Sequence, residues 1–157
     1  MGSWRIVIGY ADSSFIVSLY ATDANSEAAA SASGAARMPL AWTEWHSLEV
    51  GNALRLREFR RLATDSETDE VLAAIHKDLD AGMLSRAAVD LSRSLARSRE
   101  LSEKHSAAIG TRSLDILHVA IALELQASEF PFDQRQSELW HLASGRKALP
   151  QQTLSGT

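Results

Sequence analysis

The chain has 157 residues, of which 45% are hydrophobic and 23% are charged, proportions typical of one folded globular domain. It contains no cysteine, which excludes disulfides, zinc-thiolate sites and cysteine catalysis. The net charge of −4 argues against binding nucleic acid through a broad basic surface. The sequence has no run of 18 apolar residues and no signal-peptide pattern at its start, so we expect a cytoplasmic protein without a membrane span.

The first half of the chain is predicted to alternate strands with helices. The expected elements are a strand over 4–11, a helix over 15–20, a weaker helix over 26–37, a strand over 40–43, and helices over 43–62 and 66–81. The first strand is a β-branched apolar run typical of a buried parallel strand. Ser13 or Ser14 is the expected N-cap of the helix over 15–20, and Thr43 is the expected N-cap of the helix over 43–62. Gly82 is expected to end the helix over 66–81.

The second half adds further helices and short strands. After an ambiguous segment over 83–89, the expected elements are an amphipathic helix over 90–105, a buried helix over 114–126, a strand over 128–132, a helix from Asp133 to Gly145 and an edge strand over 146–149. Strands that alternate with helices predict an α/β fold with a parallel sheet and right-handed crossovers. We therefore predict a single domain over 1–149, followed by a polar tail over 150–157.

Four acidic residues from distant segments are predicted to meet at one edge of this sheet. Asp12 and Asp133 follow predicted strands, at the edge where parallel sheets bind ligands. Asp115 lies in the first turn of the buried helix, beside apolar neighbours that imply burial, and Glu49 lies within the helix after the second strand. Each acid also has an ordinary interpretation: Asp12 and Asp133 as N-caps, Asp115 as a partner of the helix dipole and Glu49 as a solvated position.

Clustered carboxylates imply a cation. Like charges at close range raise one another's pKa, and each group then tends to protonate unless a cation joins them. Oxygen ligands without thiolates favour Mg²⁺ or Mn²⁺, and such ions can activate water for the cleavage of phosphodiesters.

Four segments resemble the motifs of PIN-domain ribonucleases, and their order and spacing resemble VapC-type toxins of bacterial toxin–antitoxin pairs. The segments are Tyr10–Phe15, Leu48–Leu54, Gly110–Ala120 and Phe132–Gln136. The resemblance covers about residues 5–149, and the third segment is its most specific part. One departure is Pro131, which stands where the fourth motif usually has a threonine.

The resemblance implies a PIN-like three-layer fold, with a short central parallel sheet flanked by helices, and an endoribonuclease activity. It carries over Asp12, Glu49, Asp115 and Asp133 as the metal-binding and catalytic acids, with Mg²⁺ or Mn²⁺ as the cofactor. Ser14 and Arg112 match supporting positions. The implied partners are a VapB-like antitoxin, a structured RNA substrate and a second copy of the chain in a homodimer.

Two alternatives remain open. The first is a PIN scaffold used only for protein interaction, against which the intact acids argue. The second is a helical oxidoreductase with carboxylate-bridged iron, suggested by an acid and a histidine three residues apart, as in Asp115 and His118. The iron alternative conflicts with the strand-like first segment, and we interpret His46 and His118 as structural.

Aromatic and basic residues could contact RNA but have simpler interpretations. Trp42, Trp45 and Trp140 could stack on bases, although such residues more often belong to a core or interface. The basic group on the helix that bears Glu49 could meet phosphate or form a solvated face; its members are Arg55, Arg57, Arg60 and Arg61.

Overall fold

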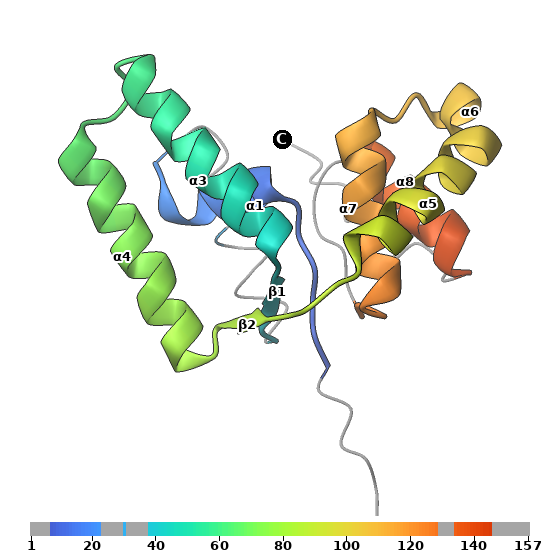
Figure 1. The fold of residues 1–157 in the computed structure, drawn as a ribbon, viewed down its shortest axis with the longest axis horizontal. Coiled ribbons are helices and arrows are strands. Elements are labelled where there is room, and N and C mark those ends of the chain that lie inside the picture. The colour runs from blue at the N-terminus through green and yellow to red at the C-terminus, as the bar shows by residue number, and fades with distance from the viewer. Residues whose placement is uncertain (1–6, 23–29, 31–37, 129–133, 146–157) are drawn as a thin grey trace, which may run out of the picture.

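The computed structural model describes residues 7–22, 30, 38–128 and 134–145, and helices predominate in them (Figure 1). The elements are α1 (Ser13–Tyr20), β1 (Leu40–Trp42), α3 (Glu44–Phe59), α4 (Asp65–Ala81), β2 (Leu84–Arg86), α5 (Leu91–Leu101), a π-helical turn (Ser102–Ser106), α6 (Ala107–Ile109), α7 (Ser113–Glu124) and α8 (Gln134–Ser144). The predicted α/β class is confirmed at this level. None of the described helices is both long enough and apolar enough to cross a membrane.

The sheet is small and parallel in the described part of the chain. Strands β1 and β2 pair in parallel, with Leu40 opposite Leu84, and α3 and α4 form the connection between them. The extended segment before α1 lies along the other side of β1, where the Ala41 N–H donates to the Gly9 carbonyl at 2.8 Å. In its described part, residues 7–11, it forms one isolated bridge rather than the predicted strand.

Several predicted elements lie wholly or mostly outside the described residues. They are the helix over 26–37, the edge strand over 146–149 and the tail over 150–157. Of the strand predicted over 128–132, only Ser128 is described, and its N–H donates to the Ile8 carbonyl at 2.9 Å. The end of the α7 segment therefore lies beside the extended N-terminal segment.

The helices form two groups on either side of the strands (Figure 1). The N-terminal helix group consists of α1, α3 and α4, and the C-terminal helix group consists of α5 to α8. Each group has its own hydrophobic cluster, one around Phe15 and Ile75 and the other around Ile121 and Leu139. Tyr10 packs in the C-terminal cluster and Ala11 in the N-terminal one, so the chain crosses the boundary immediately before Asp12.

Helix boundaries mostly follow the sequence, with informative exceptions. Thr43 caps α3 in a capping box that His46 completes, and Gly82 ends α4 in the left-handed conformation at φ 77°. Asp12 caps α1, so the prediction of Ser13 or Ser14 as the N-cap was wrong. The helix predicted over 90–105 ends as an α-helix at Leu101, where the π-helical turn begins.

Several leucines of the predicted helices are exposed. They include Leu48 on α3, Leu95 on α5 and Leu114 at the start of α7. Leu114 was one of the neighbours from which we expected Asp115 to be buried, and it is 53% exposed. The apolar pattern marked the helices correctly, but the position of the neighbouring elements decides which part of each helix is covered.

Candidate acidic site

Three of the four predicted acids line one pocket of about 340 Å³ between the two helix groups. Its lining residues are Asp12, Ser13, Ser14, Glu49, Arg112, Ser113, Leu114, Asp115 and His118. Asp12 comes from the extended N-terminal segment, Glu49 from α3 and Asp115 from the first turn of α7. The fourth predicted acid, Asp133, lies outside the described residues.

Asp12 is buried and serves two purposes. Its Oδ1 caps α1 by accepting the Phe15 N–H at 2.8 Å, and it also accepts the Ser14 hydroxyl at 2.9 Å. The ordinary interpretation of Asp12 as an N-cap is therefore correct, and the same carboxylate also lines the pocket. The supporting role of Ser14 stays a prediction.

Glu49 is not the solvated helix residue of its ordinary interpretation, because its side chain is only 22% exposed. Its Oε2 accepts the Ser13 hydroxyl at 2.7 Å and the His118 Nε2–H at 2.6 Å. Burial acts to raise the pKa of Glu49, but the hydrogen bonds from His118 and Ser13 outweigh it and hold the pKa below its usual value. At this acid, the expected mutual rise in carboxylate pKa is absent.

Asp115 is held through its two oxygens. Its Oδ2 accepts the Nε–H of Arg112 at 2.9 Å, while its Oδ1 accepts an amide hydrogen of Gln136 from α8. The Arg112 side chain is 82% exposed, so solvent weakens this ion pair. Arg112 thus contacts Asp115, and its supporting role stays a prediction.

Gln136 links two of the acids. Its Nε2 donates to Asp12 Oδ2 at 3.0 Å and to Asp115 Oδ1 at 2.9 Å. The side chain is buried, and it comes from the first turn of α8. Gln136 is the last residue of the fourth PIN-like segment, but the sequence pattern predicted no role for it, because its amide carries no charge.

Glu49 is the end of a hydrogen-bond chain that runs through His118 to Tyr10. His118 donates from Nε2 to Glu49, and its Nδ1 pairs with the Tyr10 hydroxyl at 2.7 Å. Burial, followed by the charges of Glu49 and Asp12, raises the pKa of Tyr10 well above its usual value, so this hydroxyl keeps its proton. The sequence pattern indicated a core histidine at His118 but not its contact with Glu49, because the two residues are 69 positions apart and meet only in the folded chain.

His46 is a second buried histidine with a fixed tautomer. Its Nδ1 accepts the Thr43 N–H at 3.1 Å, which leaves Nε2–H to donate to the Ala11 carbonyl at 2.8 Å. Burial lowers the pKa of His46 to about 4. Because both ring nitrogens of His46 and of His118 already have partners, neither ring offers a lone pair to iron, which argues against the oxidoreductase alternative.

The residues of the pocket suit a hard cation in charge and in ligand type. Three carboxylates line it, and Arg112 is the one basic residue among the described lining residues. Carboxylate oxygens are the ligands that Mg²⁺ and Mn²⁺ prefer. Across the described ranges, however, no three Asp, Glu or His side chains are already arranged to hold one ion. Asp12, Glu49 and Asp115 therefore line one pocket but would need side-chain movements to share a metal.

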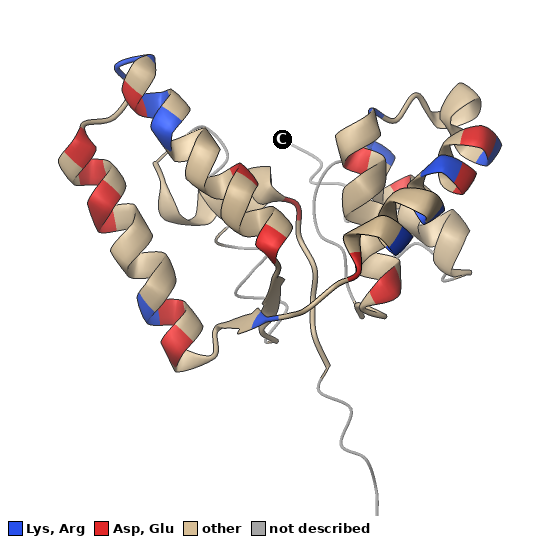
Figure 2. Cartoon of the chain, viewed as in Figure 1, with Lys and Arg blue, Asp and Glu red and all other residues tan. Residues whose placement is uncertain are grey.

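The three tryptophans considered for base stacking and the basic group over residues 55–61 do not line this pocket. Trp140 is buried and Trp45 packs against the same hydrophobic cluster, which supports their interpretation as core residues. The basic residues of α3 lie toward its C-terminal end, far from β1 (Figure 2). One of them, Arg57, donates to the Thr22 carbonyl at 3.0 Å.

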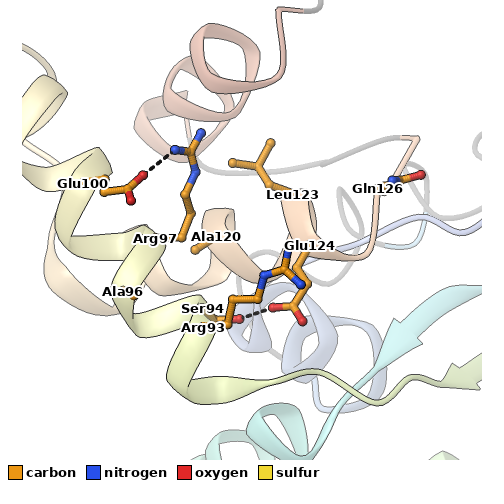
Figure 3. A pocket seen from close by; sticks show the side chains of 9 residues that line it. All are labelled: Arg93, Ser94, Ala96, Arg97, Glu100, Ala120, Leu123, Glu124 and Gln126. Atoms are coloured by element: carbon orange, nitrogen blue, oxygen red, sulfur yellow. Dashed lines mark hydrogen bonds and ion pairs between the residues drawn. The ribbon is translucent and has the colours of Figure 1, made fainter.

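A separate hollow of about 580 Å³ lies between α5 and α7 (Figure 3). Within its lining, Arg97 pairs with Glu100 at 2.6 Å, and Glu124 accepts the Ser94 hydroxyl at 2.7 Å. None of the three acids lines it, so it is distinct from the acidic pocket.

No protein-family model matches this chain, and no curated protein matches its sequence significantly.

Proposed function

We propose that this protein is a metal-dependent endoribonuclease with a PIN-like three-layer fold, acting as the toxin of a toxin–antitoxin pair. One observation carries the proposal. Asp12, Glu49 and Asp115 are separated by long stretches of sequence, yet they line a single pocket. The PIN resemblance implies the same convergence of acids.

In this proposal the three acids hold Mg²⁺ or Mn²⁺, and Asp133 completes the set. The bound cation supplies Lewis-acid activation of water and neutralises charge that develops on the phosphate. Ser13 and His118 fix one oxygen of Glu49, and Ser14 with the start of α1 fixes one oxygen of Asp12. These hydrogen bonds hold the two carboxylates at the pocket, and side-chain movements would bring them into one set of ligands when the cation binds.

The partners follow from the same proposal. A toxin of this kind needs a silencing antitoxin of the VapB type, cuts a structured RNA and acts as a homodimer in the cytoplasm. The exposed Arg112 at the rim of the pocket is the described basic residue best placed to meet an RNA phosphate. An acidic protein can hold RNA locally in this way without a broad basic surface.

The non-catalytic scaffold has one observation in its favour. Among the described residues, no three acids are already arranged to hold one metal ion. A scaffold would bind its partners without a divalent cation, whereas the nuclease requires one. Binding of Mn²⁺ to the isolated protein therefore separates the two functions.

The decisive experiment compares RNA cleavage by the wild type, Asp12→Asn and Asp80→Asn, each with Mn²⁺ and with EDTA. Asn caps a helix about as well as Asp, so α1 should persist while the charge is lost. We expect Asp12→Asn to cut at least roughly a hundredfold more slowly. Asp80, an exposed acid on α4, provides the matched control and should cut like the wild type.

The products report the attacking group. Water attack leaves 3′-hydroxyl and 5′-phosphate ends, whereas attack by the 2′-hydroxyl of the RNA leaves a cyclic phosphate. Cleavage that survives EDTA, or that survives in folded Asp12→Asn protein, would refute the proposed function.

A further inference from the structure

We propose that Gln136 is a positioning residue of the acidic site, whose amide nitrogen brings Asp12 Oδ2 and Asp115 Oδ1 together as the two oxygens that face a shared cation. The inference rests on the proposed function, because it assigns a role toward the same Mg²⁺ or Mn²⁺. It concerns a residue of α8 that carries no charge.

The amide nitrogen of Gln136 faces the two carboxylates. Ionised carboxylates only accept hydrogen bonds, so the nitrogen rather than the oxygen of the amide must face them. The NH₂ group has two hydrogens, and the two contacts of 3.0 Å to Asp12 and 2.9 Å to Asp115 use one each. Gln136 is only 1% exposed, so water does not compete for these bonds and the side chain has little room to turn.

The remaining contacts of the two acids show which oxygens are left for a cation. Each carboxylate oxygen offers two lone-pair sites. Asp12 Oδ1 uses both, on the Phe15 N–H and the Ser14 hydroxyl, so Oδ2 is the oxygen with a free site. On Asp115, Oδ2 is turned toward Arg112, and Oδ1 is the oxygen that lies beside Asp12.

An uncharged donor suits this position better than a charged one. A lysine or arginine would neutralise the acids and compete with the cation, while a carboxylate would repel them. The amide reduces the cost of holding two acids near each other, yet it leaves their negative charge available. It also links the C-terminal helix group to Asp12, so that α8 helps to set the distance between the two acids.

The test measures the affinity for Mn²⁺, by calorimetry, of the wild type, Gln136→Met and Gln134→Met. Methionine matches the length of glutamine but cannot donate. Loss of an outer hydrogen bond to a metal ligand typically weakens metal binding about 10- to 100-fold, and we expect a loss in this range for Gln136→Met. Gln134 is exposed on the same turn of α8, so Gln134→Met should bind Mn²⁺ like the wild type.

The outcomes separate this inference from the proposed function. If the wild type does not bind Mn²⁺, the proposed function fails. If the wild type binds Mn²⁺ and Gln136→Met binds it equally well, only the positioning role fails, even if the variant melts at a lower temperature.

A second measurement uses the unaltered chain and so does not depend on how a variant folds. The two side-chain amide protons of Gln136 should exchange slowly with solvent and should shift when Mg²⁺ is added, as observed by NMR. The amide protons of Gln134 should exchange fast and stay unchanged. Saturation with Mg²⁺ that leaves the Gln136 signals in place would overturn the inference.

Discussion

The two helix groups contribute different kinds of residue to the boundary between them. The N-terminal helix group supplies Glu49 from α3, next to Asp12 at the start of α1. The C-terminal helix group supplies one acid, Asp115, and also the donors His118 and Gln136 that contact the acids of the other side. Asp12 and Glu49 thus accept hydrogen bonds from both sides, and residues of both groups line the acidic pocket.

Helix α7 begins differently from the longer helices around it. Helices α1, α3 and α4 of the N-terminal group, and α5 of the C-terminal group, each have a side-chain cap. Helix α7 begins without a side-chain cap among the described residues, and it carries Asp115 in its first turn instead. A carboxylate there interacts favourably with the helix dipole. Local capping therefore stabilises the starts of the other four helices, while α7 depends more on burial.

The largest expected effect comes from truncating the core of either group. Phe15 and Leu139 are fully buried, one in each cluster. Phe15→Ala should lower the free energy of unfolding by about 3–5 kcal/mol, and Leu139→Ala should lower it by about 2–5 kcal/mol. Because the segment before Asp12 packs in both clusters, we expect a single unfolding transition in urea for each variant. Leu142→Ala, at an exposed position of α8, is the control. Two separated transitions would contradict the shared boundary.

The second prediction concerns acid. Burial lowers the pKa of His46 from 6.5 to about 4, so the unfolded chain takes up a proton as the pH falls through 6.5 while the folded protein does not. Stability that is complete above 6.5 is therefore lost as the pH falls toward 4. From pH 7 to pH 5 this histidine should remove about 2 kcal/mol from the free energy of unfolding.

Urea unfolding at the two pH values measures this loss. His46→Gln, which does not titrate, should lose correspondingly less stability than the wild type over the same interval. Equal losses in both proteins would show that His46 does not control the acid sensitivity of this part of the core.

A smaller effect is expected at the cap of α4. The Thr64 hydroxyl accepts the Glu67 N–H at 3.2 Å, and Glu67 in turn accepts the Thr64 N–H at 2.7 Å. Thr64→Ala removes one half of this capping box and should cost about 1 kcal/mol. Thr64→Ser keeps the hydroxyl and should cost much less. If both variants lose the same stability, the cap is not what stabilises the start of α4.

The smallest effect is expected for the ion pair at the rim of the pocket. Since Arg112 is mostly exposed, Arg112→Ala should change the free energy of unfolding by no more than about 0.5 kcal/mol. A loss above about 1 kcal/mol would mean that the start of α7 depends on this pair despite its exposure. Thermal unfolding at low and high salt measures both the size of the effect and its screening.

The sequence determined the helices and their ends where local chemistry decides. Thr43 and Gly82 were correctly predicted as a start and a stop, since capping and the left-handed conformation depend on a few adjacent residues. The α/β class followed from the alternation of apolar patterns. The PIN-like layers, the single domain over 1–149 and the role of Asp133 stay predictions.

Only the tertiary structure decided how the acids are held. The sequence singled out Asp12, Glu49 and Asp115 because charged residues beside apolar segments are conspicuous. It could not single out Gln136 or Tyr10, whose roles arise from contacts between residues more than 100 positions apart. Such contacts depend on how whole helices pack, and packing follows from the combined shape of many side chains rather than from any local pattern.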